Sequence, residues 1–282
     1  MTPRRAQEYS IDLGATLELV DFLGASGVSA IVLLGFTGEF VHFALDDRRH
    51  MFNFAVKRSR LPLLVNVSHS TLDGAVELGR EAAIAGAAGL LVMPPYYYRY
   101  SQPAIREFFV TFAAEVGDAV PLYLSGLDPS LANPLLSIGL FAGIVASADM
   151  ADLAGLTAQT LPARFVLLAG CERTYAAAKS LGAAGIVSGI ASAVPELIVA
   201  LDEALGSGLA ERATRLEARV AEFLDWADQL PFPVGIKEAA RHRKLRTGAP
   251  AAPLSEQENR RLEEFREWFA GWLPAVLREC QP

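Results

Sequence analysis

The sequence is poor in the residues on which cross-linked and metal-binding proteins depend. Its 282 residues include two cysteines, Cys171 and Cys280, which are too few for a disulfide framework or a paired-cysteine metal motif. Its four histidines show no i,i+4 pair of the kind that binds a metal. We therefore expect neither a metal nor another cofactor, and the scarcity of cysteine favours a reducing, cytoplasmic compartment.

Basic charge and long apolar runs are also scarce. A net charge of −7, with no block of Lys and Arg, argues against a nucleic-acid partner. No apolar run is long enough to cross a membrane, and residues 1–14 lack the apolar core of a signal peptide. Hydrophobic residues are nevertheless abundant, at 52%. The chain can bury a large core, and we expect no membrane partner.

Short apolar runs recur roughly every 20 to 30 residues, which is the spacing of a strand followed by a helix. They predict strands at 30–35, 61–68, 89–95, 120–126, 143–148, 165–170 and 185–191. Most of these runs are apolar throughout, as parallel strands buried on both faces are. The amphipathic segments between them predict helices, for example at 46–60, 72–85, 102–116 and 172–182. The links SGVSA, AGAAG and LGAAG then predict glycine at three helix C-termini.

This series of strand–helix units predicts an α/β fold, most simply a (β/α)8 TIM barrel, with a doubly wound sheet as the alternative. The barrel is one strand short, because only about a dozen residues precede the helix expected at 15–26. Either the first strand is short or missing, or the natural start lies upstream. After residue 206 the strand rhythm stops, and 209–229, 235–246 and 255–279 predict helices. The predicted domains are a barrel over 1–206 and a C-terminal helical region over 207–282.

Four motifs carry a resemblance to a known family: GFTGEF (35–40), PPYYYRYSQ (94–102), LYLSG (122–126) and the segment that begins PFPVGIKEAA (231–240). In this order they resemble the dihydrodipicolinate synthase / N-acetylneuraminate lyase family of class I aldolases. That family has a Gly-x-Thr-Gly-Glu turn, a Pro-Tyr-Tyr segment and a Tyr-Asn strand. The resemblance runs from about residue 11 to the end. It implies a lyase acting on pyruvate or another small 2-oxo acid.

The resemblance also implies a lysine on the strand at 143–148 that forms a Schiff base with the 2-oxo acid. Val145 stands at that position, and valine cannot form an imine. Lys237, in GIKEA (235–239), copies the letters of the motif but lies beyond the predicted strands. We interpret Lys237 as a solvated helix lysine, like Lys57, Lys179 and Lys244, with a place at the barrel mouth as the alternative.

Further roles are implied by the resemblance. Tyr123 matches the tyrosine that relays protons to and from the substrate, so it is the predicted catalytic residue. Thr37 and Gly38 match the turn that holds the 2-oxo acid carboxylate, and Phe36 replaces the first hydroxyl residue of the relay. Together with Val145, the residues Tyr97 and Val187 complete the predicted substrate-binding set.

Tyr97 also matches an aromatic residue that the family donates across a subunit interface, which implies a homodimer or homotetramer. Asp128 occupies the region where dihydrodipicolinate synthases place an arginine for their second substrate. The reversed charge argues against that substrate.

Two classes of function follow. The first is a lyase that works through an unrecognised amine or through a non-covalent acid/base route at Tyr123. The second is a catalytically silent relative that keeps the pocket as a ligand-binding or regulatory module. Cys171 with His69 as a base is a further conceivable pair, with a buried, inert cysteine as its alternative.

Overall fold

A computed structural model describes residues 1–5, 10–146 and 165–281 of the chain. The chain divides into two compact units. Unit 1 comprises residues 1–61 and 188–282, and unit 2 comprises residues 62–187. No helix in the described ranges is both long enough and apolar enough to cross a membrane.

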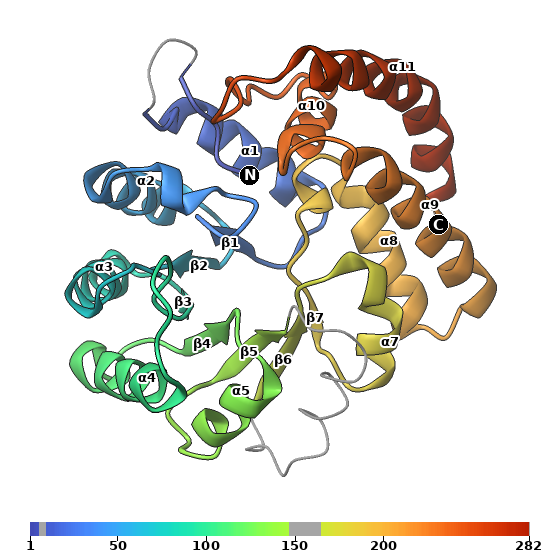
Figure 1. The fold of residues 1–282 in the computed structure, drawn as a ribbon. Coiled ribbons are helices and arrows are strands. Elements are labelled where there is room, and N and C mark those ends of the chain that lie inside the picture. Colours follow the sequence, from blue (N-terminus) through green and yellow to red (C-terminus); the bar gives the residue numbers. More distant parts are fainter. Residues whose placement is uncertain (6–9, 147–164, 282) are drawn as a thin grey trace. The chain divides into compact units, whose positions relative to one another are not determined.

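Unit 2 is built on six parallel strands, each paired with the next one along the chain (Figure 1). They are β2 (Leu63–Asn66), β3 (Gly89–Val92), β4 (Leu122–Ser125), β5 (Gly143–Ala146), β6 (Val166–Ala169) and β7 (Gly185–Ile186). A doubly wound sheet would reverse its strand order at a switch point. The consecutive order of these strands is that of a barrel, so the predicted fold class is confirmed.

The helices of unit 2 follow the strands as predicted. They are α3 (Leu72–Ala85), α4 (Gln102–Val116), α5 (Pro129–Leu136) and α7 (Tyr175–Ser180), the last preceded by the 3-10 turn η2 (Glu172–Thr174). One face of the sheet, including Leu90, Leu124 and Ile144, is fully buried. The segment predicted as a strand at 143–148 is a strand to Ala146, and Ser147 and residue 148 lie outside the described residues.

The described residues of unit 1 contain one short strand and most of the helices that the structure describes. Its elements are α1 (Leu13–Ala25), β1 (Ile31–Leu33), η1 (Phe40–His42), α2 (Leu45–Arg58), η3 (Ile190–Ser192), α8 (Pro195–Gly206), α9 (Ala210–Ala227), α10 (Val234–His242) and α11 (Glu256–Glu279). Among its described residues before α1, the only extended pairing is an isolated bridge from Arg4 to Ile11. A short or missing first barrel strand stays a prediction, because residues 6–9 lie outside the described residues.

Helices α9 and α11 pack through an aromatic core, in which the ring of Phe223 lies 5.8 to 6.1 Å from those of Phe265, Phe269 and Trp272. A capping box between Ser255 and Glu258 fixes the start of α11. The C-terminal helices are thus confirmed. The boundary at residue 206 coincides with the end of α8, but a separate domain beyond it stays a prediction.

The three glycine-rich links end their helices as predicted. Gly27, Gly86 and Gly182 have φ values of 86°, 94° and 97°, in the left-handed region that glycine enters without a steric penalty. Each residue lets the chain leave its helix and turn toward the next strand. The predicted glycine caps are confirmed.

Candidate functional site

The turn after β1 is closed by its own backbone hydrogen bonds. The N–H of Gly38 donates to the carbonyl of Gly35 at 2.9 Å, and the N–H of Glu39 donates to the carbonyl of Phe36 at 3.0 Å. A side chain at position 38 would meet Gly35 and the backbone of Leu34 at 3.0 Å, so the turn closes on itself only with glycine there. Two N–H groups are thereby used inside the turn, and Thr37 is its hydroxyl residue.

Thr37 is half-buried, and it packs against the segment before η3 within unit 1. A Cβ atom built on Gly189 would lie 2.6 Å from Thr37 Oγ1 and 3.1 Å from Ile236 Cδ1. The lack of a side chain at Gly189 therefore makes the space that the Thr37 side chain occupies. Threonine can offer a hydroxyl and its N–H to a carboxylate, which is the chemistry predicted for this residue.

The interpretation of Lys237 as a solvated lysine is wrong. Lys237 is 3% exposed, and its Nζ forms an ion pair with the carboxylate of Glu39, which is 6% exposed. Both residues belong to unit 1. Helix α10 is buried on all sides here, because its seven consecutive residues from Val234 to Ala240 are buried. Lys57 and Lys244 are exposed, as predicted, and Lys179 is half-buried.

Burial lowers the pKa of the Lys237 amine from its ordinary value, and repulsion from Arg4 and Arg241 acts in the same direction. Attraction to the Glu39 carboxylate opposes this shift. The other oxygen of Glu39 lies 3.4 Å from His42 Nδ1. A buried amine beside a carboxylate is a typical feature of functional sites, although structural ion pairs also have it.

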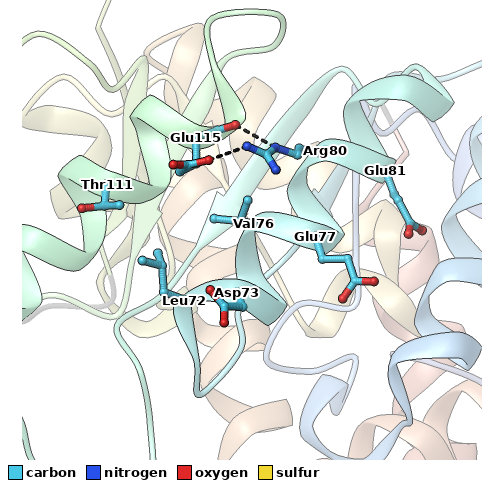
Figure 2. A pocket seen from close by; sticks show the side chains of 8 residues that line it. All are labelled: Leu72, Asp73, Val76, Glu77, Arg80, Glu81, Thr111 and Glu115. Carbon is cyan, nitrogen blue, oxygen red and sulfur yellow. Dashed lines mark hydrogen bonds and ion pairs between the residues drawn. The ribbon is translucent and has the colours of Figure 1, made fainter.

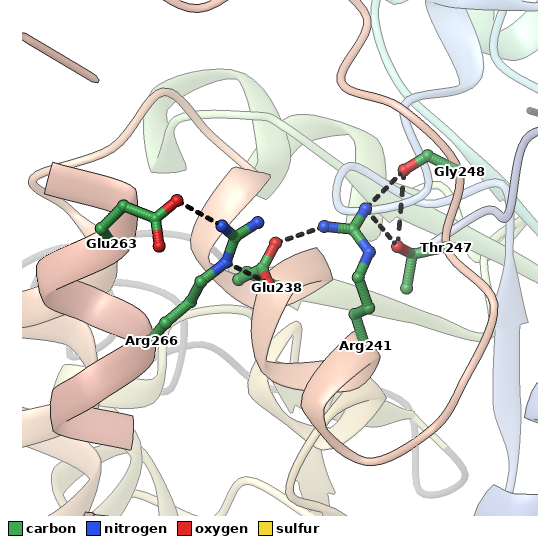
Figure 3. A network of polar contacts seen from close by, with 6 residues as sticks. All are labelled: Glu238, Arg241, Thr247, Gly248, Glu263 and Arg266. Atoms are coloured by element: carbon green, nitrogen blue, oxygen red, sulfur yellow. Dashed lines mark hydrogen bonds and ion pairs between the residues drawn. The ribbon is translucent and has the colours of Figure 1, made fainter. Parts of the chain in front are cut away.

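Helix α10 is held by a second set of charges on the residue next to Lys237. Glu238, which is 6% exposed, pairs through one oxygen with Arg241 and through the other with Arg266 Nε at 2.7 Å (Figure 3). Arg241 also donates to Thr247 Oγ1 at 3.0 Å and to the carbonyl of Gly248 at 2.8 Å. These contacts connect α10 to α11 and to the segment between them.

Two aromatic side chains flank the turn. Phe36 is 72% exposed and its ring lies 5.0 Å from that of Phe232, which is 53% exposed. Phe36 offers no hydroxyl, and its place in a proton relay stays a prediction. The pair gives this side of the turn an apolar surface.

In unit 2, Tyr123 and Val145 lie on the same face of the sheet. Tyr123 on β4 pairs with Gly143 on β5, and Ser125 pairs with Val145 two residues further along. In a parallel ladder, paired residues point to the same side. Val145 is 6% exposed, and the half-buried Tyr123 packs its ring against Gly89 and Gly143. The hydroxyl of Tyr123 can serve as an acid or base on this face.

A polar chain links the ends of β2 and β3. Asn66 is buried and its side-chain oxygen accepts from the N–H of Ser68 at 3.2 Å, while Ser68 Oγ accepts from the N–H of Met93 at 2.9 Å. His69 Nδ1 accepts from the N–H of Thr71 at 3.1 Å. This bond places His69 at the start of α3, where it has a structural role.

Three further residues named in the sequence analysis, Val187, Tyr97 and Asp128, lie in unit 2. Val187 extends the pairing of β7, because its N–H donates to the carbonyl of Ala169 at 2.8 Å. Tyr97 is 88% exposed with a φ of 82°, and its ring meets that of Tyr98 edge-on at 4.9 Å. Asp128 caps α5 by accepting from the N–H of Leu131 at 3.1 Å. Asp128 thus has a structural reason to be acidic.

A shallow pocket lies on the outer surface of unit 2, between α3 and α4 (Figure 2). Its rim carries Asp73, Glu77, Glu81 and Glu115 against the single cation Arg80, which pairs with Glu115. This excess of negative charge repels a carboxylate ligand. The pocket therefore does not suit a 2-oxo acid.

Sequence reasoning missed the contact between Glu39 and Lys237. Each residue stands in a motif that was recognised, Glu39 in GFTGEF and Lys237 in GIKEA. A signal was present, because a carboxylate in an apolar strand-end turn and a lysine in an apolar helix both need a partner when buried. Nothing in the local spacing indicated that the two were partners.

Comparisons with known proteins agree with this architecture. Residues 2–268 match the Dihydrodipicolinate synthetase family. A 4-hydroxy-tetrahydrodipicolinate synthase 1 from Streptomyces coelicolor is 33% identical over 275 residues, covering 94% of this chain and 88% of the relative.

Solved structures give the same result. A dihydrodipicolinate synthase from Aquifex aeolicus superposes with a TM-score of 0.88 at 23% identity, covering 96% of this chain and 95% of that one. YagE, a prophage protein of the dihydrodipicolinic acid synthase family from Escherichia coli, was solved in complex with pyruvate. It superposes with a TM-score of 0.83 at 25% identity, covering 93% of each chain. The family match spans nearly the whole chain, and the chain belongs to the dihydrodipicolinate synthetase family.

Proposed function

We propose that this protein binds pyruvate or another small 2-oxo acid in a lyase-type pocket that lacks the usual Schiff-base lysine. Family membership supports the ligand class, as does the pyruvate bound to the related YagE. The family resemblance assigns Thr37 to the ligand carboxylate, with Gly38 closing the turn beside it, and it assigns Tyr123 to the acid or base. By the same resemblance, Phe36, Tyr97, Val145 and Val187 are the other proposed ligand contacts.

One observation carries the proposed loss of covalent chemistry. Val145 stands on the Tyr123 face of the sheet where the family resemblance expects the lysine, and its aliphatic side chain cannot form an imine. The sequence of unit 2 contains one lysine, Lys179, whose Nζ donates to the carbonyl of Ala184 from helix α7. A reaction would then depend on non-covalent acid/base catalysis through Tyr123.

A catalytically silent, ligand-binding or regulatory homologue is the second candidate. Phe36 favours it, because a phenyl ring replaces the hydroxyl of the proton relay, so two chemical roles are altered together. Both candidates retain the 2-oxo acid pocket. We also propose a homodimer or homotetramer, with Tyr97 at the interface, in the cytoplasm.

Borohydride trapping tests the absence of an imine. The protein is incubated with pyruvate, reduced with borohydride and measured by intact mass spectrometry, while pyruvate binding is followed by ligand-observed NMR. We expect binding without a trapped adduct. An adduct on any lysine would overturn this part of the proposal, and peptide mapping would show whether Lys237 carries it.

The role of Thr37 is tested through Gly189. Gly189→Ala adds a methyl group that overlaps Thr37 Oγ1, so it should displace Thr37 and weaken pyruvate binding about tenfold. Gly206→Ala in α8 is the matched control, because nothing lies within 4 Å of the added methyl group. Equal affinities for both variants would remove Thr37 from the binding site.

A further inference from the structure

The ion pair between Lys237 and Glu39 has no role in the chemistry proposed above, yet it is buried. Both partners are less than a tenth exposed. Removing two charges from water is costly, and such a pair adds little net stability compared with apolar side chains of the same size. A buried pair is therefore better explained by the conformation it selects than by the stability it provides.

Glu39 determines the conformation of the turn at 35–40. Its backbone is left-handed, with a φ of 53°, which is unfavourable for a residue with a side chain. Its N–H closes the turn on Phe36, and its carbonyl accepts from the N–H of His42 at 2.9 Å to begin η1. Displacing Glu39 would open both ends of this turn, and Thr37 lies within it.

Lys237 supplies a fixed point for Glu39. The N–H of Lys237 donates to the carbonyl of Pro233 at 3.0 Å, and the next residue, Glu238, is held by Arg241 and Arg266 (Figure 3). Helix α10 also packs closely against α9. A Cβ atom added at Gly235 would lie 2.9 Å from Ala227, the last residue of α9. The ammonium group therefore projects from a helix that is itself anchored on two sides.

We propose that Lys237 is a positioning residue that, through Glu39, holds the turn at 35–40 in the conformation in which Thr37 binds a ligand carboxylate. This inference rests on the proposed function. Lys237 acts through another residue and is not a catalytic residue. Its amine is held by the Glu39 carboxylate, so it is not free to attack a carbonyl carbon.

The experiment compares wild type with Lys237→Met, Glu39→Gln and the double variant, using pyruvate as the probe. The first measurement is the dissociation constant for pyruvate of the folded protein. The second is hydrogen exchange in peptides covering 34–43. Lys237→Met should weaken binding about tenfold and speed exchange in these peptides. The double variant should recover part of both, because it leaves no uncompensated buried charge.

Arg246→Met is the matched control. It removes an ion pair with Asp12 and Glu18 that lies at the surface of the same unit, so both measurements should match wild type. If Lys237→Met does not fold, Lys237→Arg keeps the charge with a different shape and should show the same changes in smaller degree. Unchanged affinity and unchanged exchange in a folded Lys237 variant would overturn the inference.

The outcome also separates this inference from the proposed function. If wild type binds no 2-oxo acid, the proposed function fails, and the exchange measurement alone decides whether Lys237 holds the turn. If wild type binds pyruvate and the Lys237 variants bind it equally well, the inference fails while the proposed function stands.

Discussion

The two units differ in whether a motif position carries a buried amine. Unit 1 buries an amine, Lys237, against a carboxylate on a tight turn, whereas unit 2 places the apolar Val145 where the family resemblance expects an amine. A buried amine needs a counter-charge, and Glu39 supplies it in unit 1. A valine needs only apolar neighbours, which the packed sheet provides. Lys237 keeps the sequence of the lysine motif but lies on helix α10. The strand position where the resemblance expects that lysine carries Val145.

The largest expected effect is on the ionic side of this comparison. Lys237→Met leaves the Glu39 carboxylate buried without its partner, and the free energy of unfolding should fall by about 3 to 5 kcal/mol. Urea denaturation followed by circular dichroism measures it. Arg80→Met in unit 2 is the control, because the Arg80–Glu115 pair is about half exposed and should contribute little. If Lys237→Met and Arg80→Met lower the free energy of unfolding by similar amounts, the buried pair contributes no more than the exposed one, and the prediction is wrong.

The next effect tests the packing of unit 2. Gly143→Ala places a methyl group against the Val166 carbonyl oxygen and 2.9 Å from the Tyr123 ring. Overpacking of this kind costs about 1 to 3 kcal/mol, and the free energy of unfolding should fall by that amount. In Gly185→Ala, also in a strand, the nearest atom is 3.9 Å away, and little change is expected. Denaturation of the two variants should rank them in this order.

A smaller effect concerns pH. Burial lowers the pKa of Lys237 below its ordinary 10.5, so between the native and the unfolded pKa the unfolded chain binds more protons. The contribution of Lys237 to the free energy of unfolding should therefore rise with pH through this window. The groups around the amine are Glu39, Arg4, Arg241 and the α-amino group of Met1.

The measurement is the difference between the wild-type and Lys237→Met unfolding free energies from about pH 7 to pH 10.5. Subtraction cancels the titration of groups that the two proteins share. A difference that stays level or falls as the pH rises would contradict the lowered pKa of Lys237.

The smallest expected effect is a null result. Val145→Lys adds an amine to the Tyr123 face, yet we expect it to give no brisk aldolase turnover, because the proposed proton relay still lacks a hydroxyl at Phe36. Release of pyruvate from aldol substrates, monitored with a coupled dehydrogenase, measures turnover. Val145→Met controls for the longer side chain. Robust activity in Val145→Lys alone would show that Phe36 is harmless.

Much of the fold could be predicted from the sequence because its signals are local. Apolar runs located β1 to β7, and the three glycine links ended their helices with left-handed residues. The ends of the strands were predicted less well than their positions. The run predicted as a strand at 185–191 forms only the two-residue strand β7 and then the 3-10 turn η3, which begins after Gly189. Local propensity sets the element, and tertiary packing sets its length.

The sequence predicted only part of the candidate site. The motifs indicated the turn at 35–40, Tyr123 and Val145, and register within one sheet then placed Tyr123 and Val145 on one face. The interpretation of Lys237 as solvated failed because it relied on the average behaviour of lysine. Its burial follows from the burial of α10 on all sides, and its partner is nearly two hundred residues earlier.

By itself, the sequence determined the order of strands and helices, the glycine caps and the absence of an amine at Val145, since each of these depends on residue identity and short-range periodicity. Only the tertiary structure decided that Lys237 meets Glu39. A buried charge requires a partner, but which distant residue supplies it depends on how the chain closes on itself, and no local pattern encodes that contact.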